Sequence, residues 1–309
     1  MRDVPLNVLR GFLMGSADVV PGVSGGTVAL VLGIYPRLVG SIRAGSSAIA
    51  YALRGNFTTA RSRLGEVEWG FLISLLAGIG IAVLTMAHTI EVLLTEHREA
   101  MAGLFLGLVS GSAVVACRLV ERWDARGITM LVVVAVATFF LLGLRASTST
   151  DVAADTAGRS LLTFFGSGAI AICAMILPGI SGSFLLVMLG MYGAVLGAVN
   201  DRDLAVVFVF AAGCVVGLGL FSQVLHWALG NHYTAVMSAL IGLMVGSTRV
   251  LWPWPAGVES TELASPGDPI AAPIVLALAG LVLVVGFDIL ALRITRRSVS
   301  DEAADVHGV

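Results

Sequence analysis

Two apolar stretches of this chain, 8–36 and 161–199, are each interrupted by the sequence Pro-Gly-x-Ser-Gly. The interruptions are PGVSG at 21–25 and PGISG at 178–182. Inside a membrane, backbone that leaves the helical conformation is tolerated only where it is buried in protein or lines a water-filled cavity. A chain with two such interruptions therefore needs further helices to enclose them.

The composition supplies apolar segments for those helices. The chain is 57% hydrophobic and 12% charged, whereas soluble domains carry about 25% charged residues. A membrane-spanning helix needs about 20 predominantly apolar residues. Six unbroken segments meet that requirement: 69–90, 99–120, 128–144, 204–229, 234–252 and 271–292. The sequence therefore predicts an all-α polytopic membrane protein.

Arginine placement predicts the orientation of these segments. All 18 basic residues are arginine, and arginine-rich loops favour the cytoplasmic side. If both interrupted stretches enter and leave on one side and the N-terminus is cytoplasmic, 13 arginines face the cytoplasm and five face outward. If each stretch instead crossed the membrane, the basic segment 37–63 would face outward, against this rule. We therefore expect re-entrant hairpins and two cytoplasmic termini in a multi-pass protein of the cytoplasmic membrane.

The two interrupted stretches resemble each other. Segment 21–40 matches 178–197 at eight of 20 positions, and segment 75–112 matches 210–247 at nine of 38 positions. The offsets are 157 and 135, so the first half contains 22 extra residues, which fall in the Arg- and Ser-rich segment 41–68. Two matches in the same order predict an internal duplication.

Each duplicated unit is expected to contain one re-entrant hairpin and three spans. Because three is odd, the second unit enters the membrane in the opposite orientation, and the hairpin tips meet near mid-membrane. Inverted repeats with interrupted helices are typical of secondary transporters. The predicted parts are unit 1 (1–144, with hairpin 8–36 and cytoplasmic connection 37–68), unit 2 (145–297, with hairpin 161–199) and a cytoplasmic tail (298–309).

The hairpin tips are the predicted substrate site. Pro21 and Pro178 would each end a half-helix, and the residues after Ser24 and Ser181 would begin the next. A helix start presents free N–H groups and the positive end of the helix dipole, which favour an anion such as phosphate. The alternative is that these small residues only allow close helix packing. The candidate binding residues are Pro21, Gly22, Ser24, Gly25, Gly26, Thr27, Pro178, Gly179, Ser181, Gly182, Ser183 and Arg249.

Few charged residues accompany the tips. Asp18 precedes Pro21 by three residues, and an acid at membrane depth costs about 2.5–3.5 kcal/mol on insertion scales. Asp18 is therefore a candidate ion or proton carrier, with capping of the loop as the alternative. Arg249, at the outer end of a span, could attract an anionic head group, with an interfacial anchor as the alternative.

Catalytic, metal and cofactor motifs are not apparent. The chain has no lysine, no HExxH motif and no Ser–His–Asp spacing, so an enzyme such as a lipid phosphatase is not expected. We also expect no metal, no cofactor and no nucleic-acid partner.

The tip sequences resemble those of a known family. "GSADVVPGVSGGTVALVLGIY" (15–35) and "LPGISGSFLLVMLGMY" (177–192) are similar to the bacterial PopT family, and the likeness covers nearly the whole chain. The resemblance implies a translocase that returns undecaprenyl phosphate, or a shorter polyprenyl phosphate, from the outer to the inner leaflet for reuse in envelope glycan synthesis. By motif position it assigns the Pro-Gly-x-Ser-Gly residues, Asp18 and Thr27 to the tips. The second tip has Phe184 in place of a threonine.

A polyprenyl phosphate has a head that must cross the apolar layer and a tail that can remain in lipid. We therefore expect a small central anion site, alternately exposed, that opens sideways to the bilayer. The main alternative is a secondary transporter of a small soluble anion; a scaffold without transport is another. Proton or cation coupling, the isoprenoid chain length and a homo-oligomer stay open.

Overall fold

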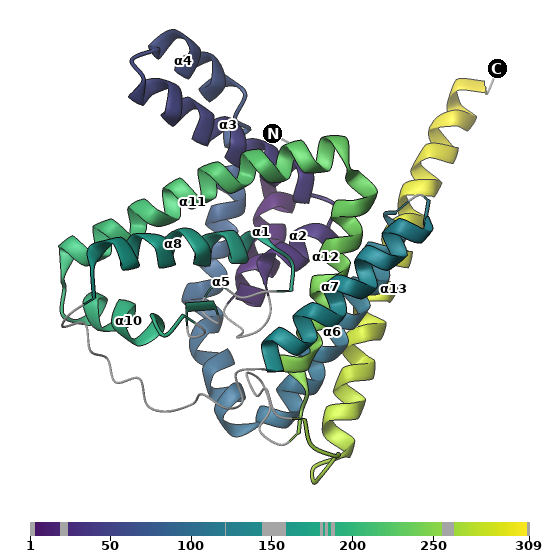
Figure 1. The fold of residues 1–309 in the computed structure, drawn as a ribbon. Helices are drawn as coiled ribbons and strands as arrows, with labels where there is room; N and C mark the ends of the chain where they lie inside the picture. Colours follow the sequence, from purple (N-terminus) through teal and green to yellow (C-terminus); the bar gives the residue numbers. More distant parts are fainter. Residues whose placement is uncertain are drawn as a thin grey trace.

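The computed structural model describes residues 4–18, 24–120, 122–143, 159–179, 182, 185–186, 189–254 and 263–307, and every regular element among them is helical (Figure 1). Six helices are long and apolar enough to cross a membrane, which confirms the predicted multi-pass all-α fold. They are α5 (Trp69–Glu96), α6 (Arg98–Arg118), α7 (Ala125–Gly143), α11 (Leu204–Asn231), α12 (Tyr233–Ser247) and α13 (Ala271–His307).

α6 and α12 are the most buried of these helices. The buried share of the apolar segment is 61% in α6 and 56% in α12, against 17% in α11 and in α13. The outer helices expose large apolar side chains such as Phe208 and Leu283. An apolar surface of this extent is expected where a protein faces lipid.

The first interrupted stretch forms α1 (Val4–Asp18) and α2 (Gly25–Val31), both shorter than the length that crosses a bilayer. α1 packs along α5 through glycines. A Cβ atom on Gly11 would clash with the carbonyl of Leu75, and one on Gly78 would clash with that of Val8. The two backbones can approach this closely only because both positions lack a side chain.

The second stretch repeats this arrangement. It contains α8 (Leu161–Ile176) and α10 (Tyr192–Asn200), and α8 packs along α11. Cβ atoms on Gly168 and Gly213 would clash with carbonyls of the facing helix. Gly168 and Gly213 align with Gly11 and Gly78 at the offsets found in the sequence. The same glycine crossing therefore occurs at corresponding positions.

Two turns also correspond. His97, between α5 and α6, has φ −133° and ψ 49°, and His232, between α11 and α12, has φ −136° and ψ 46°. Gly33 and Gly190, before α3 and α10, have φ 69° and 65°. These geometries recur where the two halves align. The division into two units and their opposite orientation across the membrane stay predictions.

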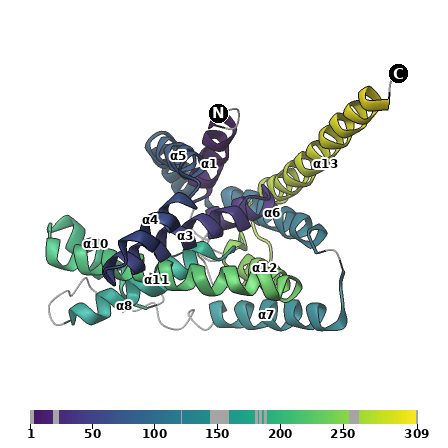
Figure 2. The ribbon, with the colours of Figure 1, turned by 90° about the horizontal axis from the view of Figure 1, so that it is seen from above.

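Two helical segments extend beyond the predicted spans and hairpins. The connection 37–68 contains most of α3 (Tyr35–Leu53) and all of α4 (Phe57–Gly65), a helical arm that projects from the body (Figure 1). α13 extends past the predicted end of its span at 292 and through most of the predicted tail, away from the other helices (Figure 2). Hydropathy locates apolar runs, and a helix can continue beyond them into a polar segment.

Candidate functional site

The two hairpin tips contact each other. Ser24 Oγ donates a hydrogen bond to the carbonyl of Met175 at 3.1 Å, and the Gly179 N–H donates to Thr27 Oγ1 at 2.9 Å. The Tyr35 hydroxyl donates to the carbonyl of Ile176 at 3.2 Å. Because 141 or more residues separate the partners in each bond, these contacts join the two interrupted stretches directly.

The contact is buried. Ser24, Thr27 and Tyr35 are 1%, 2% and 0% exposed. A buried polar group without a hydrogen-bond partner costs about 1–3 kcal/mol, so the bonds between the tips stabilise this buried contact.

Glycines permit the close approach. A Cβ atom on Gly26 would lie 2.6 Å from the carbonyl oxygen of Ile176. Gly179 has φ 87°, in the left-handed region that favours glycine, and a Cβ atom there would lie 2.8 Å from Cα of Met244 in α12. The conformation of the second tip therefore requires glycine at position 179.

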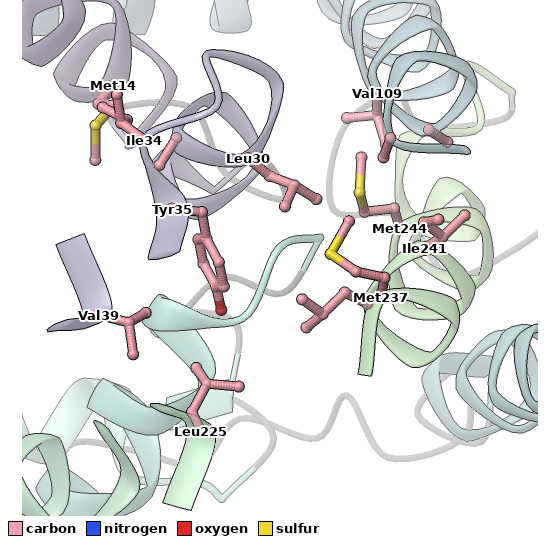
Figure 3. Packing of buried hydrophobic residues seen from close by; sticks show 14 of the residues in the cluster. Met14, Leu30, Ile34, Tyr35, Val39, Val109, Leu225, Met237, Ile241 and Met244 are labelled. Carbon is pink, nitrogen blue, oxygen red and sulfur yellow. The ribbon is translucent and has the colours of Figure 1, made fainter. Parts of the chain in front are cut away.

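Methionines and aliphatic side chains surround the joined tips. Figure 3 shows the Tyr35 ring, whose hydroxyl bonds to the last residue of α8, and Leu30 facing Met237, Ile241 and Met244 of α12. Methionine is flexible and adapts to irregular surroundings. The tips thus form a polar centre inside an adaptable apolar shell.

Asp18 caps the helix that follows the first break. Its carboxylate accepts a hydrogen bond from the Gly25 N–H at 2.6 Å, and Ser24 Oγ accepts from the Gly26 N–H at 3.1 Å. The Thr27 N–H donates to the Ser24 carbonyl at 2.9 Å. The sequence led us to expect that the first amides of α2 are free to donate hydrogen bonds to an anion. In the structure they donate to acceptors of the protein itself, and one of these acceptors is the Asp18 carboxylate.

The other candidate residues differ in what the structure shows. Pro178, Gly179 and Gly182 are buried, and a Cβ atom on Gly182 would lie 2.9 Å from the Ala171 carbonyl. Arg249 follows α12 and places its guanidinium 4.8 Å from the centroid of the Phe139 ring of α7. Four of the candidates lie outside the described residues: Pro21, Gly22, Ser181 and Ser183.

Sequence reasoning missed two contributors to the site. Tyr35 was not a candidate, although it aligns with Tyr192 in the duplication and closes the tip contact. The carbonyls at the end of α8 were also missed, because any residue type carries them. Within the described part of the chain, no group of three or more His, Cys, Asp or Glu side chains could hold a metal ion.

Comparison with known proteins identifies the family. A profile described as undecaprenyl phosphate translocase-like matches residues 14–267. A polyprenyl-phosphate transporter from Vibrio cholerae serotype O1 is 37% identical over 246 residues, which cover 80% of this chain and 77% of that protein. A polyprenyl-phosphate transporter from Staphylococcus aureus is 30% identical over 260 residues, 80% of this chain and 86% of that one.

No solved structure matches this chain. The matched region contains both tips and extends from within α1 to beyond α12. The chain therefore belongs to the undecaprenyl phosphate translocase-like family of membrane proteins.

Proposed function

We propose that this protein moves polyprenyl phosphate from the outer to the inner leaflet of the cytoplasmic membrane, so that the lipid carrier can be reused for envelope glycan synthesis. The names of the two relatives and of the family support this substrate. The observation that carries the mechanism is the hydrogen-bonded contact between the two tips. It places hydroxyls, amides and a carboxylate together within an otherwise apolar helical protein.

The tips are suited to a phosphate head group on a lipid. Ser24 and Thr27 are hydroxyl-bearing groups held in place by the opposite tip, and both can donate to phosphate oxygens. The isoprenoid tail requires no polar site and can stay in the bilayer while the head crosses. The two halves would move relative to each other, exposing the tips first to one leaflet and then to the other.

Asp18 occupies the place that an anion would take at the start of α2. Its carboxylate accepts from Gly25 N–H, and helix N-termini bind phosphate through the same amides. Two anions at one helix start repel each other, so phosphate binding requires that Asp18 be displaced, protonated or paired with a cation. We propose that this exchange couples lipid movement to a proton or cation.

The orientation follows from charge. The arginine excess on the N-terminal, 37–68, 118–127 and C-terminal segments supports a cytoplasmic location for these segments and for both termini. The polyprenyl phosphate is the proposed substrate, and surrounding membrane lipids are the proposed partners of the exposed apolar helices.

Reconstitution tests the proposal. Proteoliposomes would contain a fluorescent short-chain polyprenyl phosphate, and a membrane-impermeant quencher would report the fraction in the outer leaflet. Wild-type protein should speed the exchange between leaflets, and Ser24→Ala should slow it about tenfold, since one buried hydrogen-bond partner is worth about 1–3 kcal/mol.

Ser74→Ala is the matched control. Ser74 is a buried serine of α5 whose hydroxyl donates within its own helix, to Phe71. Its removal should leave exchange unchanged. If wild-type protein moves inorganic phosphate into liposomes and leaves the lipid distribution unaltered, the protein is a transporter of a soluble anion instead.

A further inference from the structure

A second polar region lies away from the tips. A cavity of about 590 Å³ lies between the segment that joins α6 to α7 and the turn that joins α11 to α12. Arg122, Arg126 and Met130 line one side, and Asn231, His232 and Tyr233 line the other. α7 and α12 pack side by side here (Figure 2).

The cavity carries net positive charge. Arg122 and Arg126 are exposed, and neither makes an ion pair with any residue that the structure describes. Among the described residues of the lining Asp124 is the one acid, and its carboxylate accepts from the Gly127 N–H at 2.8 Å. Arginine binds phosphate oxygens through paired N–H donors. Two arginines against one engaged carboxylate therefore favour an anion.

The start of α12 adds to this charge. Tyr233, Thr234 and Ala235 are its first residues and line the cavity. His232, which precedes the helix, does not cap it with its side chain. The positive end of the α12 dipole thus faces the same space as the two arginines.

An apolar groove continues from the cavity along α7. Its volume is about 380 Å³, and it is lined by Ala125, Arg126, Thr129, Met130 and Val133. Arg126 and Met130 line both spaces, so cavity and groove adjoin at these two side chains. Positions 126, 130 and 133 share one face of a helix. Met130 and Val133 are 42% and 57% exposed, and α7 is a span, so this face meets lipid.

We propose that this cavity and groove form a docking site for a lipid phosphate monoester, with the phosphate on Arg122 and Arg126 and the hydrocarbon chain along Met130 and Val133. A soluble phosphate would occupy only the cavity and not the groove. The inference rests on the proposed function. In the predicted topology the cavity opens at the cytoplasmic surface, so it is where the polyprenyl phosphate leaves the tips for the inner leaflet.

Photolabelling tests the site. Full-length protein in nanodiscs would receive a short-chain polyprenyl phosphate with a diazirine in its isoprenoid chain, and labelled peptides would be mapped. We expect saturable labelling of α7 around Met130 and Val133. Excess unlabelled polyprenyl phosphate should compete, and inorganic phosphate at the same concentration should not.

Two variants test the arginine-lined cavity and the apolar groove separately. Arg122→Ala/Arg126→Ala should raise the half-saturating concentration for α7 labelling about tenfold, because charge-assisted hydrogen bonds are worth about 1.5–3 kcal/mol. Val133→Trp, at an exposed position that tolerates a larger side chain, should block the groove and reduce labelling with both arginines intact. Arg54→Ala/Arg61→Ala is the control, since it removes two exposed arginines of the α3–α4 arm and should have no effect.

The proposal is overturned if α7 is not labelled, if inorganic phosphate competes as well as the lipid, or if both cavity variants keep wild-type labelling. Leaflet exchange by the same purified wild-type protein is measured in proteoliposomes. Absence of that exchange contradicts the proposed function, whereas normal exchange with unaltered labelling of the variants contradicts the docking site alone.

Discussion

The tips and the arginine-lined cavity are two ways of presenting polar groups to an anion. At the tips, Ser24 and Thr27 are buried and hydrogen-bonded to the opposite half, and the nearby charge is the acid Asp18. In the cavity, Arg122 and Arg126 are exposed. Burying an arginine at membrane depth is costly, and a desolvated arginine would hold a phosphate tightly. Neutral donors suit a site through which the head group passes, and arginines suit a surface where it stops.

The largest expected effect comes from the backbone of the second tip. Gly179→Ala forces a side chain into a positive-φ conformation and against Cα of Met244, 2.8 Å away. Such strain costs on the order of 1–3 kcal/mol, and we expect leaflet exchange to fall about a hundredfold. Gly190→Ala is the control, because Gly190 has φ 65° with open space around it. Equal losses of exchange in both variants would mean that strain alone, and not the tip contact, explains the effect.

A smaller effect is expected from Thr27→Val, which keeps the side-chain shape and removes the acceptor of the Gly179 N–H. One unsatisfied buried donor costs about 1–3 kcal/mol, so exchange should slow about tenfold. Thr138 of α7 is also buried, and Thr138→Val provides the matched control. Thermal unfolding of both variants would show whether their stability changes by the same amount. If leaflet exchange also slows tenfold in Thr138→Val, the effect of Thr27→Val is not specific to the tips.

Asp18→Asn tests whether the negative charge of Asp18 opposes phosphate binding at the tips. The amide oxygen can still accept from Gly25 N–H, but it no longer repels phosphate. Protonation of Asp18 at low pH has the same effect in the wild type, so wild-type exchange should rise as pH falls and the variant should show a flatter profile. Ionisation of the lipid phosphate affects both proteins equally. Parallel pH profiles would rule out coupling through Asp18.

The smallest effect is expected from Tyr35→Phe. The lost hydrogen bond to Ile176 is 3.2 Å long, and a neutral hydrogen bond contributes about 0.5–1.5 kcal/mol. We expect exchange to slow about threefold. Tyr192, the aligned residue, is 40% exposed, so Tyr192→Phe should have no effect. A larger effect at Tyr192 than at Tyr35 would show that the hydrogen bond between Tyr35 and Ile176 does not explain the loss of exchange.

The sequence predicted the spans and the pairing of the tips for identifiable reasons. Apolar run length locates membrane helices, because a helix must cross a fixed thickness. The meeting of the two hairpin tips was expected because PGVSG and PGISG recur in the duplicated halves, although the α8 carbonyl that Ser24 contacts was not.

Other features were predicted only in part or not at all. Capping by Asp18 was one of two alternatives, but its partner Gly25 is seven residues away, and the sequence between them has no periodic pattern that indicates this contact. The arginine-lined cavity was missed because Arg126 and Tyr233 come together only when α7 packs on α12. Tertiary packing, and not local sequence, determines both.

The central claim is that the joined tips must separate for the phosphate to pass. Ser24→Cys and Met175→Cys, in a chain without Cys117, Cys173 and Cys214, would be joined by a short reducible thiol cross-linker across the contact between Ser24 Oγ and the Met175 backbone. Leaflet exchange of labelled polyprenyl phosphate is measured before cross-linking, after it and after reduction. We predict that exchange by the double variant, already slowed by loss of the Ser24 hydroxyl, stops on cross-linking and returns on reduction, and that the cross-linker leaves exchange by each single-cysteine variant at its own starting rate. Undiminished exchange by fully cross-linked protein would contradict the account.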